Sequence, residues 1–258
     1  MQNFYWNTIG KGKINIVLLS GWGINVKIWL FIIKQLPPCF KFHLIDLPGL
    51  GKNKELDPMK IDQIIYMLHC FMPKKSIWLG WSMGGLIASR FALSYPNDTL
   101  AIVSVASSPC FIKKDNWPGL EKNVIKQFYI NLKTNYQKTI KNFIYLQMTD
   151  SNKSMQDWKV FKNILSIDPD PNLKSLKNGL DIISSTDIRL EMMFLKVPLL
   201  RVYGHLDSLV PKKIITILDI KWPNTYSKII KKAAHIPFLS HKKEFCFILL
   251  QFIRSLRL

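Results

Sequence analysis

The chain has 258 residues, 48% of them hydrophobic, and a formal net charge of +19. This length and apolar content predict one domain with a sizeable core plus an insertion. No apolar run is long enough to span a membrane, and the chain does not open with a basic segment followed by an apolar one. We therefore expect a soluble, cytoplasmic protein with no membrane partner.

The positive charge is spread along the whole chain. Lys and Arg together number 36, yet only five of these residues are Arg. Dispersed lysine beside abundant Ile and Asn indicates biased codon usage more than a binding patch, so we expect no specific nucleic-acid partner. The four cysteines lack the spacing of a metal or redox site, and we predict no disulfide, no metal and no cofactor.

The first strongly apolar segment, residues 14–19, predicts a buried strand followed by the glycine-rich loop 20–23. A second strand-like run at 42–45 ends at Asp46, which we interpret as a turn-former. Further strands are predicted at 76–79 and 101–106, alternating with helical segments. This alternation is typical of an α/β fold with a mostly parallel sheet.

The segment Gly80-Trp81-Ser82-Met83-Gly84 follows the strand at 76–79 and precedes an apolar helix. Gly-x-Ser-x-Gly between a strand and a helix is typical of a nucleophile elbow, in which a sharp turn presents the serine to a base. Ser82 is thus the predicted nucleophile. One oxyanion donor in such sites is the N–H of the residue after the nucleophile, and another comes from the loop after an earlier strand. These donors would be the backbone N–H groups of Met83 and Trp22.

Between about residues 112 and 187 no strand is predicted, and the pattern favours four amphipathic helices. Asp170-Pro171 is predicted to open the last of them. We therefore expect a helical lid at 112–187 inserted into a core formed by 1–111 and 188–258. The positions that share the first helix face are Leu120, Val124, Ile125, Phe128 and Leu132, and those that share the second are Tyr136, Ile140, Phe143, Ile144 and Gln147.

Strands resume at 199–204 and 226–230, and each is followed by a candidate partner for the serine. Asp207 follows the first strand and His235 the second, in the order acid then histidine that this kind of hydrolase uses. Each lies at the carboxyl end of a strand, where α/β sheets build their sites. The remaining histidines fit less well, and only one of them, on the loop of the acid, is a serious rival. They are His43, His69, His205 (the rival) and His241.

Several motifs along the chain carry a resemblance to a known family. They are Leu18-Leu19-Ser20-Gly21-Trp22-Gly23, Asp46-Leu47-Pro48-Gly49, Ile77-Trp78-Leu79-Gly80-Trp81-Ser82-Met83-Gly84-Gly85-Leu86, Val105-Ala106-Ser107-Ser108-Pro109-Cys110-Phe111 and Ala233-Ala234-His235. Together they resemble the α/β-hydrolase family. Within that family, the chain is similar nearly end to end to methyl ester esterases that act on pimeloyl chains carried by acyl carrier protein in biotin synthesis. Ser20 is a departure, because the family usually has histidine there.

The resemblance implies a monomeric serine carboxylesterase that removes a methyl group from the carrier-linked ester. It also implies that basic residues on the lid contact the acidic carrier protein, here Lys138, Lys141, Lys159 and Lys162. Asn142 and Met155 stand where arginine would be expected. The residues implied to line the substrate path are Trp22, Ser82, Met83, Phe111, Phe143, Ile144, Tyr145, Leu146, Gln147 and His235.

Two other functions fit the sequence. A general short-chain esterase or thioesterase would share the whole catalytic set and differ only in the lid. A basic binding module without catalysis would have no need of Ser82, Asp207 and His235. Dehalogenases and epoxide hydrolases of this fold carry aspartate at the elbow, so Ser82 argues against both.

Overall fold

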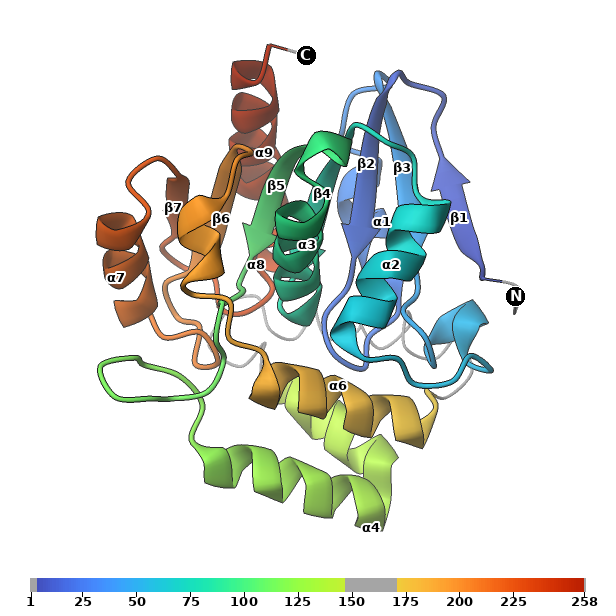
Figure 1. Ribbon diagram of the computed structural model, residues 1–258, viewed down its shortest axis with the longest axis vertical. Helices are drawn as coiled ribbons and strands as arrows, with labels where there is room; N and C mark the ends of the chain where they lie inside the picture. Colours follow the sequence, from blue (N-terminus) through green and yellow to red (C-terminus); the bar gives the residue numbers. More distant parts are fainter. Residues whose placement is uncertain (1–3, 147–170, 258) are drawn as a thin grey trace.

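The computed structural model describes residues 4–146 and 171–257. Its core is a seven-stranded sheet in the order β1-β3-β2-β4-β5-β6-β7, in which only β1 runs antiparallel to its neighbour (Figure 1). β4 and β6 are buried along their whole length, as expected when helices cover both faces of a parallel sheet. The strands are β1 Trp6–Ile9, β2 Ile14–Leu19, β3 Phe40–Ile45, β4 Ser76–Trp81, β5 Thr99–Val105, β6 Leu199–Gly204 and β7 Tyr226–Ile230.

Helices cover the sheet on both sides. In Figure 1, α2 and α3 lie in front of the central strands, whereas α1 and α9 lie behind them. Short 3-10 turns stand at Val26–Trp29, Gly51–Asn53, Pro96–Asp98 and Glu191–Phe194. The α-helices are α1 Leu30–Ile33, α2 Ile61–Phe71, α3 Met83–Ser94, α4 Lys122–Leu146, α6 Leu173–Ser185, α7 Lys213–Lys221, α8 Pro237–Ser240 and α9 Lys242–Ser255.

The insertion leaves the sheet after β5 and returns before β6. Its helices α4 and α6 lie beyond the carboxyl ends of the parallel strands, at the bottom of Figure 1. Helix α4 is broken at Asn135, whose backbone is extended (φ −156°, ψ 88°). The Asn135 side chain accepts a hydrogen bond from the Lys138 N–H (2.9 Å), so it caps the second half of α4. The two helices expected on either side of this position are therefore present as the two halves of α4.

The order of elements agrees with the prediction, with three differences. All six predicted strands are present, but β1 was not predicted. Helix α6 begins at Leu173 and not at residues 170–171, because the Asn172 side chain accepts from the Lys174 N–H (2.9 Å) and serves as the N-cap. Val124 was expected on the buried face of its helix, but 39% of its surface is exposed. A further predicted helix would fall within 147–170, outside the described residues.

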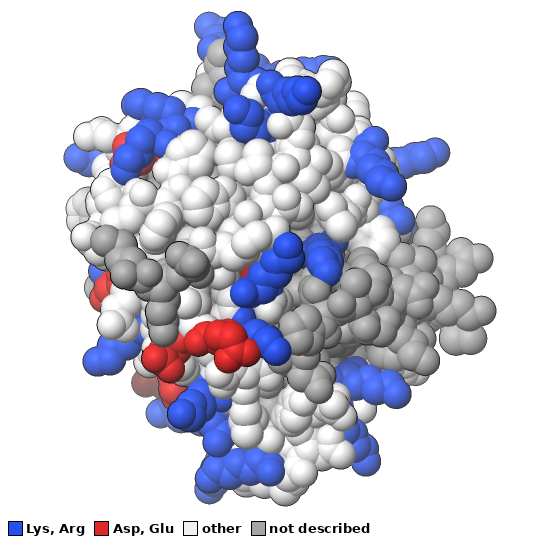
Figure 2. Space-filling view, turned by 90° about the vertical axis from the view of Figure 1, so that its right-hand side faces the viewer, with Lys and Arg blue, Asp and Glu red and all other residues white. Residues whose placement is uncertain are grey.

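The basic side chains do not form one continuous patch on the face that Figure 2 shows. Lys and Arg stand there in separate groups, with Asp and Glu side chains between some of them. In the part of the chain that the structure describes, no helix is long and apolar enough to cross a membrane. The same residues contain no cluster of three or more His, Cys, Asp or Glu side chains suited to a metal ion.

Candidate active site

Ser82 occupies the turn between β4 and α3 in a conformation that L-residues rarely adopt. Its φ of 54° and ψ of −120° are strained for a residue with a Cβ atom. The Ser82 N–H donates to the Val105 carbonyl (2.9 Å), and the Ser82 carbonyl accepts from the Gly85 N–H (2.9 Å). The turn is thereby joined to β5 on one side and to α3 on the other, in the geometry expected of a nucleophile elbow.

The flanking glycines are needed because the turn is crowded with backbone. A Cβ atom on Gly80 would lie 2.2 Å from the Gly84 carbonyl oxygen, and one on Gly84 would lie 2.6 Å from the carbonyl oxygens of Leu19 and Ser20. Neither position has room for a larger residue. The spacing of glycines around Ser82 therefore follows from the close approach of β2, β4 and α3.

Asp207 and His235 form a buried pair. The His235 Nδ1 atom lies 2.8 Å from Asp207 Oδ2, and both side chains are almost fully enclosed. The other carboxylate oxygen of Asp207 accepts from the N–H groups of Leu209 (2.8 Å) and Val210 (3.0 Å). The carboxylate is therefore fixed from both sides, and it holds the imidazole in one orientation.

The opposite edge of the His235 imidazole makes no hydrogen bond among the described residues, and its Nε2 atom is buried there. Trp81, the neighbour of Ser82, donates from its indole to the His235 carbonyl (2.8 Å), and the two rings lie 5.6 Å apart. The elbow and the histidine loop are thus joined directly. The structure therefore pairs Asp207 with His235 and places Ser82 on the adjoining loop.

The other histidines have structural partners or face solvent. His43 is buried in β3 with its Nε2 atom 2.9 Å from Asn15 Oδ1, and burial, followed by the nearby Lys41 charge, lowers the pKa of His43 to about 4. His205, the serious rival, is exposed. His69 stacks on a tyrosine in a surface cluster, and His241 precedes α9. Asp207 therefore selects His235.

Asp46 is a turn-former, as expected. One of its carboxylate oxygens accepts from the Val26 N–H (2.8 Å) and the other from the Lys52 N–H (3.4 Å), so it joins two loops at the end of β3. A Cβ atom on Gly51 (φ +48°) would lie 2.1 Å from Oδ2 of the same carboxylate. Asp46 therefore organises the loops and stands apart from the pair formed by Asp207 and His235.

The loop after β2 lies against the elbow. A Cβ atom on Gly21 would lie 3.3 Å from Ser82 Cβ, so the loop backbone passes directly beside the serine. The Ser20 hydroxyl donates to the Ile24 carbonyl (2.5 Å) and closes the loop on itself. Met83 is the first residue of α3, where backbone N–H groups have no acceptor within the helix. Both predicted donor residues, Trp22 and Met83, are thus beside the serine.

The predicted lining residues differ in their surroundings. Phe111 is buried, Phe143 is half-buried against Trp22, and 55% of the Tyr145 surface is exposed. Among the predicted carrier contacts, Lys138 and Lys141 are exposed on α4, as is Asn142. The side chains of Ile144 and Leu146, and the whole of Gln147, Met155, Lys159 and Lys162, lie outside the described residues.

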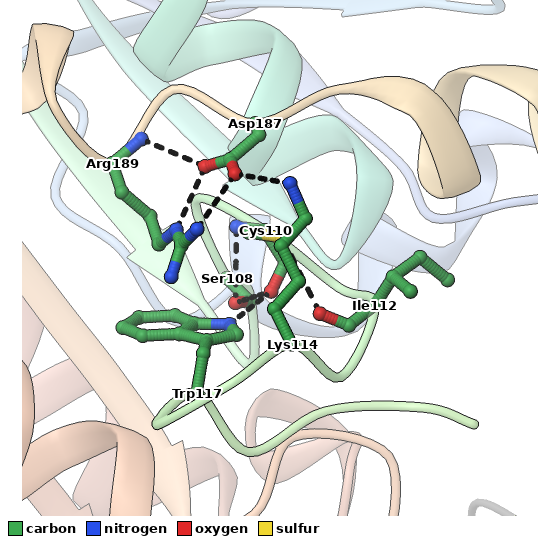
Figure 3. Close-up of polar contacts among 7 residues, drawn as sticks. All are labelled: Ser108, Cys110, Ile112, Lys114, Trp117, Asp187 and Arg189. Carbon is green, nitrogen blue, oxygen red and sulfur yellow. Dashed lines mark hydrogen bonds and ion pairs between the residues drawn. The ribbon is translucent and has the colours of Figure 1, made fainter. Parts of the chain in front are cut away.

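The sequence did not reveal a cluster that joins the two ends of the insertion (Figure 3). Arg189 donates to both oxygens of Asp187 (2.8 and 2.9 Å), and Lys114 Nζ lies 2.6 Å from the same carboxylate. The hydrogen bonds from Arg189, with those from Lys114, hold the pKa of the Asp187 carboxyl well below its usual range. We call Lys114, Asp187 and Arg189 the hinge cluster.

Buried groups surround the hinge cluster. The Cys110 carbonyl accepts from the Trp117 indole (2.8 Å) and from the Ser108 hydroxyl (2.5 Å), and the Ile188 N–H donates to the Pro109 carbonyl (3.0 Å). Burial raises the pKa of the Cys110 thiol, which therefore stays protonated and apolar. Short-range signals could not have shown these contacts, since residues 109 and 188 are far apart in the sequence and the whole insertion lies between them.

Comparisons with known proteins agree with this fold. The chain matches the family model for the alpha/beta hydrolase fold over residues 14–242. It is 41% identical over 255 residues to the pimeloyl-[acyl-carrier protein] methyl ester esterase of Serratia marcescens, covering 99% of this chain and all of the relative. It is 40% identical over 252 residues to the protein of the same name from Yersinia pseudotuberculosis, covering 98% of each chain.

Solved structures show the same fold at lower identity. An esterase from Exiguobacterium antarcticum superposes with a TM-score of 0.84 at 18% identity, and a bromoperoxidase from Bacillus anthracis with a TM-score of 0.85 at 20% identity. Each comparison covers 97% of this chain and 95% of the other. Their different names indicate that the sheet and its flanking helices do not by themselves determine the reaction.

Proposed function

The chain belongs to the alpha/beta hydrolase family, and from that premise we propose that it is a serine carboxylesterase acting on a pimeloyl methyl ester carried by acyl carrier protein. The observation that supports the chemistry is the buried hydrogen bond between His235 Nδ1 and Asp207 beside the strained turn at Ser82. The relatives that are 40–41% identical over the whole chain support the substrate.

The reaction begins with proton transfer from the serine to the histidine. Asp207 accepts the hydrogen bond from Nδ1–H of His235, which leaves Nε2 as the base. Nε2 takes the proton of the Ser82 hydroxyl as the oxygen attacks the ester carbonyl carbon. The imidazolium that forms is stabilised by the Asp207 carboxylate. Because this pair is buried, the attraction between the two charges is weakly screened.

The oxygen of the tetrahedral intermediate carries the negative charge that develops. The backbone N–H groups of Trp22 and Met83 are the donors in this proposal, and one such donor typically contributes about 10²–10³-fold to the rate. The intermediate collapses when His235 gives its proton to the methoxy oxygen and methanol leaves. Water then attacks the acyl-enzyme with His235 as the base again, and Ser82 is released together with the free pimeloyl carboxylate.

The strained backbone at Ser82 fits this role. A non-glycine residue held at such φ and ψ costs about 1–3 kcal/mol, and such strain persists only where the surrounding structure enforces it. The enforcement comes from the bonds to Val105 and Gly85 and from the close approach of Gly84 to β2. The result is a serine at a helix N-terminus, directly beside the oxyanion loop.

The insertion supplies substrate selection in this proposal. We take 112–187 as a lid over the core formed by 1–111 and 188–258, with Phe111 and the segment 143–147 along the acyl path. Helix α4 carries five lysines and no acidic residue, so its surface is complementary to an acidic carrier protein. We further propose that the protein acts as a monomer, since a single chain supplies the nucleophile, the base, the acid and both donors. We also propose that it works in the cytoplasm.

The test uses acyl carrier protein loaded with the pimeloyl methyl ester and followed by intact-mass spectrometry. The wild-type protein should remove the mass of one methylene group from the loaded carrier, which is the difference between a methyl ester and an acid. Ser82→Ala and His235→Ala should remain folded and lose about 10⁴-fold or more in kcat. A folded Ser82→Ala variant that still turns over would contradict the mechanism. Hydrolysis of free short esters without any effect on the loaded carrier would favour a general esterase instead.

A further inference from the structure

The indole of Trp22 is held by the insertion. Its Nε1 atom donates to the carbonyl of Leu176, in the first turn of α6, at 2.8 Å. A helix carbonyl has a second lone pair, so it can accept this bond in addition to its helical one. The ring packs in T-shaped contacts with Phe128 (5.8 Å between centroids) and Phe143 (5.1 Å) on α4. Only 2% of the Trp22 surface remains exposed.

Gly179 is the residue that allows this contact. It lies one helical turn after Leu176, and a Cβ atom on it would be 2.5 Å from Trp22 Cδ1 and 2.9 Å from Nε1. It would also be 3.5 Å from the sulfur of Met83, the other proposed donor residue. Glycine is unfavourable in the middle of a helix, and its conformation here requires no positive φ. Its position is therefore explained by the closeness of the indole.

The loop after β2 lies between the elbow and α6, and it separates them by one layer of backbone. On one side Gly21 faces Ser82 Cβ. On the other side Gly23 (φ +70°) faces the insertion, where a Cβ atom would lie 2.7 Å from Ile140 Cδ1 and 3.3 Å from Leu176 Cδ2. The backbone N–H of Trp22 lies in this layer. A shift of α6 would therefore move the layer against the serine.

We propose that α6 positions the oxyanion donor, with the Leu176 carbonyl and Gly179 acting as positioning residues through the Trp22 indole. This inference rests on the proposed function, because it assumes that the Trp22 N–H stabilises the oxyanion. The lid then does more than select substrates. Its helix α6 completes the catalytic geometry, and a lid that moved away from the core would also take the donor out of place.

The first test replaces Gly179 with Ala and Trp22 with Phe, separately and together. Gly179→Ala forces the indole to move, and Trp22→Phe removes the hydrogen-bond donor but keeps an aromatic ring. With the small ester p-nitrophenyl butyrate we expect kcat to fall by roughly 10–100-fold in each variant while KM changes little, because small misplacements of a catalytic group have effects of this size. The kcat of the double variant should fall no further than that of Trp22→Phe alone, since both changes act on one contact. Additive losses would overturn the inference.

The second test measures the oxyanion site without an ester. A dialkyl p-nitrophenyl phosphate forms an oxygen–phosphorus bond with Ser82 and releases p-nitrophenol, which takes the serine proton. Gly179→Ala should slow this labelling in proportion to its loss of kcat. Trp117→Phe is the matched control, because it removes an indole that also donates over 2.8 Å to a backbone carbonyl, that of Cys110. It should label at the wild-type rate, and equal slowing in both variants would overturn the inference.

The third measurement separates the inference from the proposed function. Hydrogen exchange of residues 20–24, followed by mass spectrometry, should be faster in Gly179→Ala than in the wild type and unchanged in Trp117→Phe. If the wild type neither hydrolyses the ester nor labels at Ser82, the proposed function fails, and this exchange still decides whether α6 holds the loop. Unchanged exchange in Gly179→Ala would contradict the inference whatever the activity.

Discussion

The two helices of the insertion are attached to the core in different ways. Helix α6 is tied by hydrogen bonds: the Asn172 N–H donates to the Gly49 carbonyl (2.9 Å), Asn178 Nδ2 donates to the Met59 carbonyl (2.7 Å), and the Leu176 carbonyl accepts from the Trp22 indole. The contacts that helix α4 makes with the loop after β2 are apolar, with Phe128 and Phe143 against Trp22 and Ile140 against Gly23. Tyr129 and Asp181 join the two helices by a hydrogen bond.

This difference suggests a division of labour. Hydrogen bonds fix distance and direction, whereas apolar contacts tolerate sliding and substitution. We expect α6 to hold the catalytic geometry and α4 to present the surface that meets a partner. The following predictions test this division, from the largest expected effect to the smallest.

The hinge cluster should matter most for stability, and mainly for α4. Asp187→Asn removes a carboxylate that Arg189 and Lys114 contact, and we expect a loss of about 2 kcal/mol in the free energy of unfolding. Urea unfolding measures this loss. Hydrogen exchange should rise more in α4 than in α6, because α6 keeps its own bonds to the core. Glu121→Gln, which breaks an exposed ion pair with Lys113, is the control and should have almost no effect. Equal loosening of both helices would contradict the division.

The same cluster predicts a pH dependence of stability. The pKa of Asp187 is lower in the folded protein than the usual value near 4, so its contribution is present above about pH 4 and is lost as the pH falls below that value. The stability difference between the wild type and Asp187→Asn should therefore shrink in unfolding experiments from pH 5 down to pH 3. A constant difference over that range would show that the charge is not responsible.

Charge reversal on α4 should affect only the carrier-linked substrate. Lys138→Glu together with Lys141→Glu should lower kcat/KM for the loaded carrier by about 10-fold at low salt, because the attraction that speeds association is lost. Hydrolysis of p-nitrophenyl butyrate should be unchanged. Lys212→Glu with Lys213→Glu makes the same change in charge on α7 and serves as the control. Equal losses on both substrates would mean that the α4 variant disturbs the site.

Removing the hydrogen bond from Asn178 on α6 to the Met59 carbonyl should have the smallest effect on stability. Asn178→Ala leaves the Met59 carbonyl without its side-chain donor, and we expect a loss of about 1 kcal/mol in stability. Thermal unfolding measures this loss. The control is Asn131→Ala on α4, which removes only an exposed bond to Gln127. A larger effect of Asn131→Ala than of Asn178→Ala would reverse the comparison.

Much of the fold could be predicted because its signals are local. β2, β6 and β7 have the predicted bounds, since each is an apolar run closed by turn residues. β1 was missed because it is short, lies at the edge of the sheet and has two exposed residues, Asn7 and Thr8. The start of α6 was misplaced because Pro171 and Asn172 are both common at helix starts, and the choice depended on the bond that Asn172 makes.

Part of the candidate site could be predicted from local signals in the sequence, as most of the strands were. Ser82, Asp207 and His235 each follow a recognisable strand, and strand ends in a parallel sheet meet at one edge. The contact of Trp22 with α6 spans 154 residues of sequence, and the hinge cluster joins Lys114 to Asp187, 73 residues apart. No periodicity or motif specifies such pairs. They follow from how the insertion packs.

The hinge cluster brings the two ends of the insertion to one place on the core. The Ile188 N–H donates to the Pro109 carbonyl, so the residues that flank the insertion are held together. The pairing of β5 with β6 therefore depends little on the length or sequence of the insertion between them. A different insertion could therefore be grafted between Pro109 and Ile188 without changing the order of strands. Such a graft would still need a carbonyl to receive the Trp22 indole. Under the function that we propose, an exchange of specificity would therefore have one structural condition, and this condition lies in the insertion and not in the sheet.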